Sequence, residues 1–257
     1  MSRREVCSFN SKIDANVLHT AINLLKKDDW SPKQISGHLK RDGILISHET
    51  IYRVIRSDES GELRSHCRHK LKYRRHRKII GKKTKVKNIP DRISIHDRPI
   101  EADGKRFGDW EMDTIVGRGK NSFILTLCER STNFMLMTRL IHGKNAKNVA
   151  MAVTNLLLPY KKHVKTITTD NGSEFCCHKI IAKALGTTVY FADSYSSWQK
   201  GAIENTNKLI RQYITKSMNF NDLDDDFIKN VQYKINRRPR EKLSFLSPKQ
   251  VFFENIS

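Results

Sequence analysis

The arrangement of short apolar runs after residue 107 most constrains the fold of this chain. Three nearly continuous apolar runs come first, at 112–116, 122–127 and 134–141, with Gly, Asn or Ser between them. Runs of this length are typical of strands in a buried sheet. Helices and strands then alternate: a helix at 145–160, a strand at 164–169, a helix at 173–185, a strand at 188–191, and helices at 202–218 and 222–238. This order predicts an α/β domain with a mixed five-stranded sheet flanked by helices.

In the first quarter of the chain the apolar residues have helical spacing instead. Residues 12–27 predict one helix. Ser31 before Pro32 predicts the start of a second, because serine caps helices and the first helical turn does not need the N–H that proline lacks. Gly43 ends this helix, and Ser47 caps a third. Three short helices with a glycine turn before the last are typical of a helix-turn-helix module, and a plain three-helix packing unit is the alternative.

The positive charge is concentrated in one segment. The chain holds 48 Lys and Arg against 27 Asp and Glu, a net charge of +21, and residues 64–99 alone hold fourteen against two. Between residues 64 and 87 there are no acids, which favours contact with phosphates over an ordinary solvated surface. The segment has too few apolar residues to fold alone. We therefore expect a DNA-binding module at 1–63, a basic linker at 64–99 and the α/β domain at 100–257.

Composition also indicates where the protein acts. The five cysteines are odd in number and lack CxxC pairing, which is typical of reduced thiols in an intracellular protein, and the histidines show no zinc-binding spacing with them. No apolar run is long enough to span a membrane, and the amino terminus lacks the apolar stretch of a signal peptide. We expect a cytoplasmic protein with a nucleic acid partner and no membrane association.

Three acids stand where an α/β sheet can bring them together. Asp113 lies within an apolar strand, where a carboxylate is costly without a partner. Asp170 follows the strand 166–169, at the end where such sheets place their sites, and Glu204 begins a helix. Each acid also has an explanation without function. Asp113 could face water on an edge strand, Asp170 could belong to an ordinary turn, and Glu204 could be a common first-turn glutamate of a helix. Converging carboxylates suit Mg²⁺, and two ions about 3.5–4 Å apart serve phosphodiester cleavage.

The motifs around these acids resemble a known family. Asp-Asn-Gly-Ser-Glu-Phe (170–175) and Tyr-Ser-Ser-Trp-Gln-Lys-Gly (195–201), with Glu204 following, resemble a catalytic core of the retroviral integrase type. The more specific resemblance is to the bacterial transposases of the insertion sequence 30 family. It rests on Trp-Ser-Pro-Lys-Gln-Ile-Ser-Gly (30–37), Ile-Ser-His-Glu-Thr-Ile-Tyr (46–52), Gly-Asp-Trp-Glu-Met-Asp (108–113), Glu-Asn-Thr-Asn-Lys-Leu-Ile-Arg-Gln-Tyr (204–213) and Asn-Arg-Arg-Pro-Arg (236–240).

This resemblance implies a fold and a chemistry. Residues 100–257 would form an RNase H-like integrase catalytic core, in which Asp113, Asp170 and Glu204 bind two Mg²⁺ ions, or Mn²⁺ as a substitute. The implied reaction is DNA transposition: cleavage of the element ends and strand transfer into target DNA. Two alternatives stay open, a truncated non-catalytic DNA-binding repressor and an RNase H-like nuclease that cuts without joining. The resemblance also implies a further helix-turn-helix region upstream of this chain.

The implied partners are the terminal inverted repeats of the element, the target DNA and further copies of the chain in a synaptic complex, at the bacterial nucleoid. The candidate DNA contacts are Lys208, Arg211, Trp198, Arg74, Arg75, Arg77, Lys78, His48 and Thr50. Lys208 and Arg211 share the helix face of Glu204, where they would hold phosphates, and surface solubility is their alternative. Trp198 either stacks on an unpaired base or anchors its loop in the core.

Overall fold

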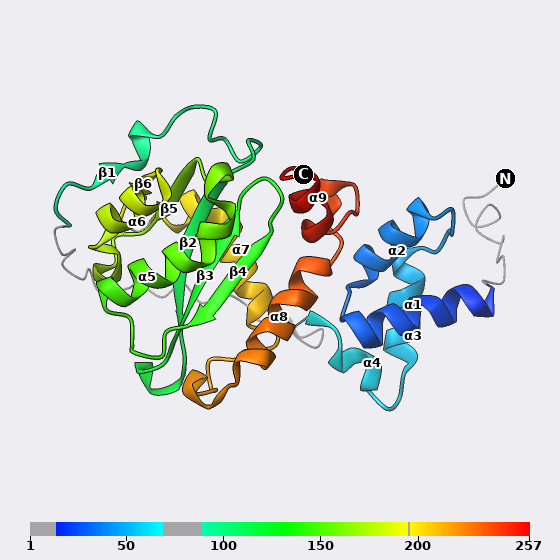
Figure 1. Cartoon of the computed structure of the whole chain (residues 1–257). Coiled ribbons are helices and arrows are strands. Elements are labelled where there is room, and N and C mark those ends of the chain that lie inside the picture. Colours follow the sequence, from blue (N-terminus) through cyan, green and yellow to red (C-terminus); the bar gives the residue numbers. More distant parts are fainter. Residues whose placement is uncertain (1–13, 69–88, 195) are drawn as a thin grey trace. The chain divides into compact units, whose positions relative to one another are not determined.

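The protein consists of two compact units (Figure 1). The structure is a computed structural model that describes residues 14–68, 89–194 and 196–257. The first unit holds the described residues up to 68 together with the loop Arg238–Leu246, and the second holds the rest. Each unit has its own hydrophobic core. Within the described ranges, no helix is both long enough and apolar enough to cross a membrane.

The first unit is helical, as predicted. Its helices are α1 (Ala15–Asp28), α2 (Pro32–Arg41), α3 (His48–Ser57) and the single turn α4 (Glu62–Ser65). Both expected caps form. The Ser31 hydroxyl accepts from the backbone N of Gln34 at 3.3 Å, and that of Ser47 accepts from the backbone N of Thr50 at 3.1 Å. The turn α4 was not predicted, because four residues are too few to show helical periodicity.

The second unit is built on a mixed sheet with the strand order β1-β6-β5-β2-β3-β4. The strands are β1 (Ile93–Ser94), β2 (Asp109–Val116), β3 (Phe123–Glu129), β4 (Met135–Arg139), β5 (Thr166–Thr169) and β6 (Thr188–Phe191). The first three long strands are antiparallel neighbours, and the β2–β5, β5–β6 and β6–β1 pairs are parallel. The mixed sheet is confirmed, but among the described residues it has six strands rather than five. The additional strand, β1, has only two residues, too few to give an alternating pattern.

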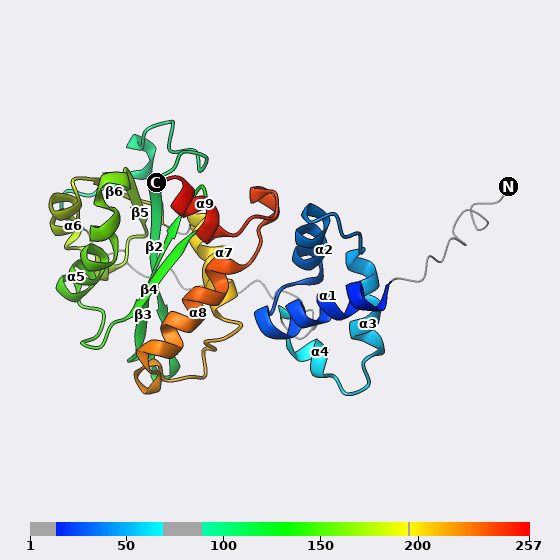
Figure 2. The same cartoon turned by 45° about the vertical axis from the view of Figure 1, so that its right-hand side comes forward.

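Helices cover both faces of this sheet (Figures 1 and 2). On one face α5 (Ala146–Leu157) and α6 (His178–Leu185) share a core with Met112 and Leu127. On the other, α7 (Gly201–Ile210) and α8 (Asp225–Arg237) pack on Ile115. The predicted helix over 202–218 ends at Ile210. A further helix, α9 (Pro248–Glu254), was not predicted; its Phe252 is buried in the first of these cores.

The edge strand β4 is capped by two amide side chains of α8. The Asn236 amide accepts from the backbone N of Met135 at 2.9 Å and donates to the backbone O of the same residue at 2.8 Å. One helical turn earlier, Gln232 accepts from the backbone N of Met137 at 2.8 Å. Backbone groups along an edge strand otherwise stay open to pairing with another chain. These amides satisfy them from within the unit.

Candidate active site

Alternation along β2 turns two acids toward α7. Ile115 belongs to the core shared with α7, so Glu111 and Asp113, at even spacing from it, face the same way. Strand β2 pairs in parallel with β5, with Glu111 opposite Thr168. Two residues further along this register, Asp113 comes opposite Asp170, directly after the end of β5. The two aspartates that the sequence singled out are therefore neighbours on the two central strands of the sheet, at the carboxyl end of β5.

A buried lysine lies between these two aspartates. The Lys200 ammonium is 3.1 Å from Oδ2 of Asp170 and 3.7 Å from Oδ1 of Asp113. The Lys200 residue is only 4% exposed, and it immediately precedes α7. The sequence analysis did not single out this residue. Its signal was a basic residue one helical turn before Glu204, which is too common to be informative alone.

Asp113 has a fixed orientation in an environment that disfavours its charge. Its Oδ2 accepts from Nδ2 of Asn207 at 2.9 Å, and its Oδ1 accepts from the backbone N of Thr114 at 2.9 Å. Burial raises the pKa of the Asp113 carboxyl, and the nearby charge of Asp170 raises it further, whereas Lys200 opposes both. A carboxylate held in this way gains from a cation beside it.

Glu204 stands on a helix that is tied to the same strand. The backbone N of Ile203 donates to Oε2 of Glu111 at 2.8 Å, and Nε of Arg130 donates to Oε1 of Glu111 at 2.9 Å. Glu111 is 1% exposed, and burial raises the pKa of its carboxyl while both donors oppose that shift. The sequence analysis did not single out Glu111 as the residue that holds the start of α7 to β2. Its signal was the spacing of two residues between Glu111 and Asp113, which places both acids on one face of a strand.

The three candidate acids do not converge on one point. Glu204 is half-buried and forms no ion pair within the described part of the chain. Across residues 14–68, 89–194 and 196–257, no group of three or more His, Cys, Asp or Glu side chains is placed to hold a metal ion. The pair Asp113 and Asp170 is nevertheless suited to a hard divalent cation. It offers carboxylate oxygens, and a positively charged group already lies between them.

A second ion pair, between Lys144 and Glu174, lies beside the aspartates. Oε1 of Glu174 accepts from Nζ of Lys144 and from Oγ1 of Thr114, each at 3.0 Å. Asp170 accepts from the backbone N of Gly172 at 2.9 Å, which closes the turn after β5. A Cβ at Gly172 would lie 2.6 Å from Oε2 of Glu174. Glycine at this position therefore lets both carboxylates approach the turn.

The loop that leads into α7 is fastened at both ends. The backbone N of Asp193 donates to Oε1 of Gln199 at 2.7 Å, and Nε2 of Gln199 donates to Oδ2 of Asp193 at 2.8 Å. His96 lies 2.9 Å from the same carboxylate. The hydrogen bond from Gln199, followed by that from His96, lowers the pKa of Asp193. At the other side, Asn171 donates to the backbone O of Ala192 at 2.7 Å. The loop is thus bound to the turn that carries Asp170.

The candidate DNA contacts are placed differently from one another. Trp198 is 72% exposed, so the alternative that it anchors the core is wrong. Lys208 is exposed on α7. Arg211 is half-buried: it donates to the backbone O of Val116 at 2.9 Å and lies over the ring of Phe220, and burial lowers its pKa. Its guanidinium holds the end of α7 to β2, and a DNA contact by it stays a prediction.

The remaining candidates lie toward the amino terminus. His48 is exposed at the start of α3, with its ring edge-on to Tyr52. Thr50 is half-buried, and its hydroxyl pairs with that of Ser47 at 2.9 Å. The last four candidates lie outside the described residues: Arg74, Arg75, Arg77 and Lys78.

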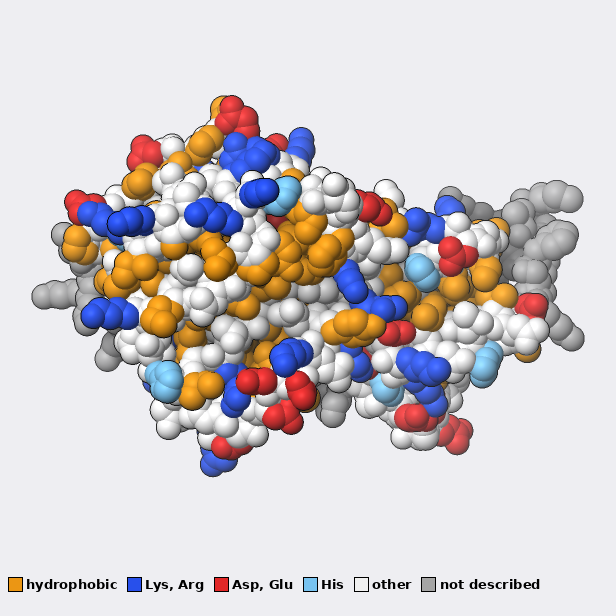
Figure 3. Space-filling view, viewed as in Figure 1, with side chains coloured by type: hydrophobic (Ala, Val, Ile, Leu, Met, Phe, Trp, Pro, Cys, Tyr) orange, Lys and Arg blue, Asp and Glu red, His pale blue; other side chains and the backbone are white. Residues whose placement is uncertain are grey.

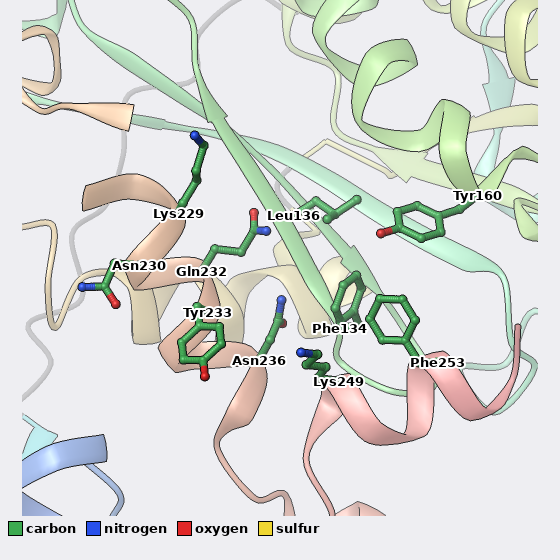
Figure 4. A pocket seen from close by; sticks show the side chains of 10 residues that line it. All are labelled: Phe134, Leu136, Tyr160, Lys229, Asn230, Gln232, Tyr233, Asn236, Lys249 and Phe253. Carbon is green, nitrogen blue, oxygen red and sulfur yellow. The ribbon is translucent and has the colours of Figure 1, made fainter. Parts of the chain in front are cut away.

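The second unit also has a cavity of about 470 Å³ that none of the candidate residues lines. Figure 4 shows its wall, built from β4, α8, α9 and Tyr160. Figure 3 shows hydrophobic side chains gathered on this face and Lys and Arg spread widely over it. The lining residues are Phe134, Leu136, Tyr160, Lys229, Asn230, Gln232, Tyr233, Asn236, Lys249 and Phe253. Asn236 and Gln232 are engaged with β4, as described above.

Comparison with known proteins finds a family model within the second unit. The family model "Integrase core domain" matches residues 104–197, which include Asp113 and Asp170. The chain is also similar in fold to the crystallised catalytic core domain of BIV integrase. That likeness has a TM-score of 0.46 and 19% identity, over 58% of this chain and 95% of the other.

Longer relatives identify the family. The chain is 42% identical to the transposase for insertion sequence element IS4351 of Bacteroides fragilis, over 92% of this chain and 72% of the relative. It is 34% identical to the transposase for IS1086 of Cupriavidus metallidurans, over 89% and 70%. It is 35% identical to transposase InsI for IS30A of Escherichia coli, over 89% and 62%. The chain belongs to the insertion sequence 30 family of transposases, as its motifs predicted.

Proposed function

We propose that this chain cuts DNA at the ends of a mobile element and joins the freed 3′ ends to target DNA. In this proposal Asp113, Asp170 and Glu204 hold divalent metal ions, Mg²⁺ or in its place Mn²⁺. One observation carries it above all: two aspartates on neighbouring parallel strands share a single cation, the Lys200 ammonium. Two carboxylates that already hold one cation are suited to the divalent ions that assist phosphoryl transfer.

The residues of the chain prepare this chemistry. Two bound ions would activate the attacking oxygen and neutralise charge on the leaving oxygen. Asn207 and Thr114 hold the Asp113 carboxylate in one orientation, so its free lone pairs keep a constant direction. Glu111 anchors the start of α7 and so fixes the helical turn that carries Glu204. The Glu204 carboxylate would complete the ligand set after its side chain moves toward the aspartates.

The rest of the chain would bind DNA. The three helices of residues 1–63 would form the helix-turn-helix module, with the exposed His48 at the start of the recognition helix. The basic linker of residues 64–99 would add phosphate contacts that do not depend on sequence. Residues 100–257 would carry the catalysis, with Lys208 on the phosphates and Trp198 stacked on an unpaired base near the cleaved end. Several copies of the chain would pair two element ends in one complex.

A strand-transfer assay tests this proposal. The purified chain is mixed with Mg²⁺, a labelled duplex carrying the inverted repeat that flanks its gene, and a supercoiled plasmid. A scrambled duplex and an Asp170→Asn variant are the controls. The proposal predicts nicked ends with free 3′-hydroxyls and labelled plasmid. Cleavage without joining would indicate a nuclease, and binding without cleavage in Mg²⁺ or Mn²⁺ would indicate a non-catalytic DNA-binding protein.

A further inference from the structure

The environment of Lys200 is unusual for a lysine. The residue is 4% exposed, and burial of an ammonium is costly unless anionic partners compensate for the lost water. Within the described part of the chain, its ammonium has only two ionic partners, Asp170 at 3.1 Å and Asp113 at 3.7 Å. Both partners are candidate metal ligands. Lys200 therefore takes up the same oxygens that a metal ion would need.

The charge balance explains why a cation is required there. Without Lys200, the carboxylates of Asp113 and Asp170 would face each other with no cation between them, and like charges at this separation repel. The next base along, Lys144, does not relieve this repulsion, because it is paired with Glu174 at 3.0 Å. One ammonium thus offsets one of the two negative charges of the aspartate pair, and a net negative charge remains.

We infer that Lys200 is an exchangeable counter-ion of the active site, which holds Asp113 and Asp170 together until a divalent metal ion displaces it. The inference rests on the proposed metal-dependent function. A lysine suits this role because its ammonium is a point charge on a flexible stem of four carbons, whereas the planar fork of an arginine would lock onto the carboxylates. The released ammonium would remain one helical turn from Glu204, beside the place where DNA phosphate would bind.

Direct measurement of metal binding tests this inference. The affinity for Mn²⁺ is measured from the electron paramagnetic resonance signal of the free ion, with the full chain and no DNA. Lys200→Met removes the competing charge but keeps the length of the side chain. We expect it to bind Mn²⁺ about tenfold more tightly than the wild type, equivalent to about 1.4 kcal/mol. Lys200→Gln should behave alike, which guards against a packing effect of one substitution.

The matched control is Lys144→Met, which removes the same charge from the neighbouring Glu174. If a general rise in negative potential were the cause, both lysine variants would gain affinity equally. We expect Lys144→Met to gain much less. Adding Asp170→Asn to Lys200→Met should abolish the gain, because the metal then lacks a ligand.

A second measurement needs no variant. Acetylation of the Lys200 amine by a limiting amount of acetic anhydride, which releases acetate, is followed by mass spectrometry and reports how often this side chain leaves the aspartates. Saturating Mg²⁺ should speed this reaction and leave the exposed Lys229 unaffected. An unchanged rate at Lys200, or equal Mn²⁺ affinity of wild type and Lys200→Met, would overturn the inference while the metal site itself stands. If no variant binds Mn²⁺ at all, the proposed metal-dependent function fails with it.

Discussion

The backbone N–H of Ile203 donates to the buried carboxylate of Glu111 across 2.8 Å, which joins the first turn of α7 to the strand of Asp113. The other oxygen of Glu111 accepts from Arg130. This carboxylate therefore accepts a hydrogen bond from a backbone N–H at the start of α7, as an N-cap side chain would. Unlike an N-cap residue, Glu111 lies on a neighbouring strand. The position of Glu204 depends on it.

We accordingly expect Glu111→Gln to destabilise the second unit and to impair cleavage. An amide offers one oxygen to two donors, and loss of one member of a buried ion pair costs about 3 kcal/mol. Urea unfolding of the purified chain measures the loss. Glu101→Gln, at an exposed position, is the control. A change in Glu111→Gln below about 0.5 kcal/mol, the range of ordinary surface substitutions, would contradict the anchoring role.

A second prediction concerns the edge of the sheet. Asn236→Leu removes the partners of both backbone groups of Met135, the N–H and the carbonyl. Each unpaired buried group costs about 1–3 kcal/mol, so we expect a loss of at least about 2 kcal/mol in unfolding free energy. Asn230→Leu on the exposed side of the same helix is the matched control. Equal losses in the two variants would show that a general effect of leucine on this helix, rather than loss of edge capping, is responsible.

The pH dependence of stability should report on His178. This residue is 5% exposed, and burial lowers the pKa of its imidazole below the ordinary 6.5, as does the adjacent Lys179. The unfolded chain therefore binds this proton more readily than the folded chain. Stability contributed by the neutral ring is present above about pH 6.5 and falls as the pH drops below it. His178→Gln should flatten this fall in urea unfolding, whereas His142→Gln, at an exposed site, should not. The same slope in both variants would exclude His178 as its source.

Much of this molecule could be predicted from its sequence. The caps at Ser31 and Ser47, the mixed sheet and the adjacency of Asp113 and Asp170 follow from local patterns and from the geometry of parallel strands. Those rules act over a few residues, or over the known end of a strand. The order of residue types along the chain is therefore enough to apply them.

The roles of Glu111, Lys200 and Asn236 could not be predicted in this way. Each contacts a group far along the chain, such as Ile203, Asp170 or Met135, and only the folded packing brings the partners together. Arg211, at the end of α7, is a further residue whose contacts could not be predicted. Its spacing from Glu204 indicated a shared helix face, and the family resemblance implied a phosphate contact there, but the carbonyl of Val116 occupies part of its hydrogen-bonding capacity. Spacing on a helix specifies the face of a side chain and not the identity of its partner.

The basic segment should bind DNA through phosphates alone. Twelve Lys and Arg lie between residues 64 and 87. If about five of them contact phosphates, the logarithm of the binding constant should fall against the logarithm of salt concentration with a slope of about −4 to −5. Alanine at Arg74, Arg75, Arg77 and Lys78 together should flatten this slope and weaken binding to all duplexes alike. A loss confined to one DNA sequence would show that the segment reads bases.

Asp113, Asp170 and Glu204 are proposed to act together on metal ions. Glu204 is the least supported of the three, because no cation among the described residues bridges it to either aspartate. The decisive measurement is Mg²⁺-dependent cleavage of a labelled element end by Glu204→Gln, beside Glu174→Gln as the nearest competing glutamate. Since loss of a supporting residue costs about 10–100-fold at metal sites, loss of a ligand should cost more than about a hundredfold. We predict that loss for Glu204→Gln with DNA binding nearly intact, and a much smaller one for Glu174→Gln. Cleavage retained by Glu204→Gln and lost by Glu174→Gln would contradict the account and assign the third ligand to Glu174.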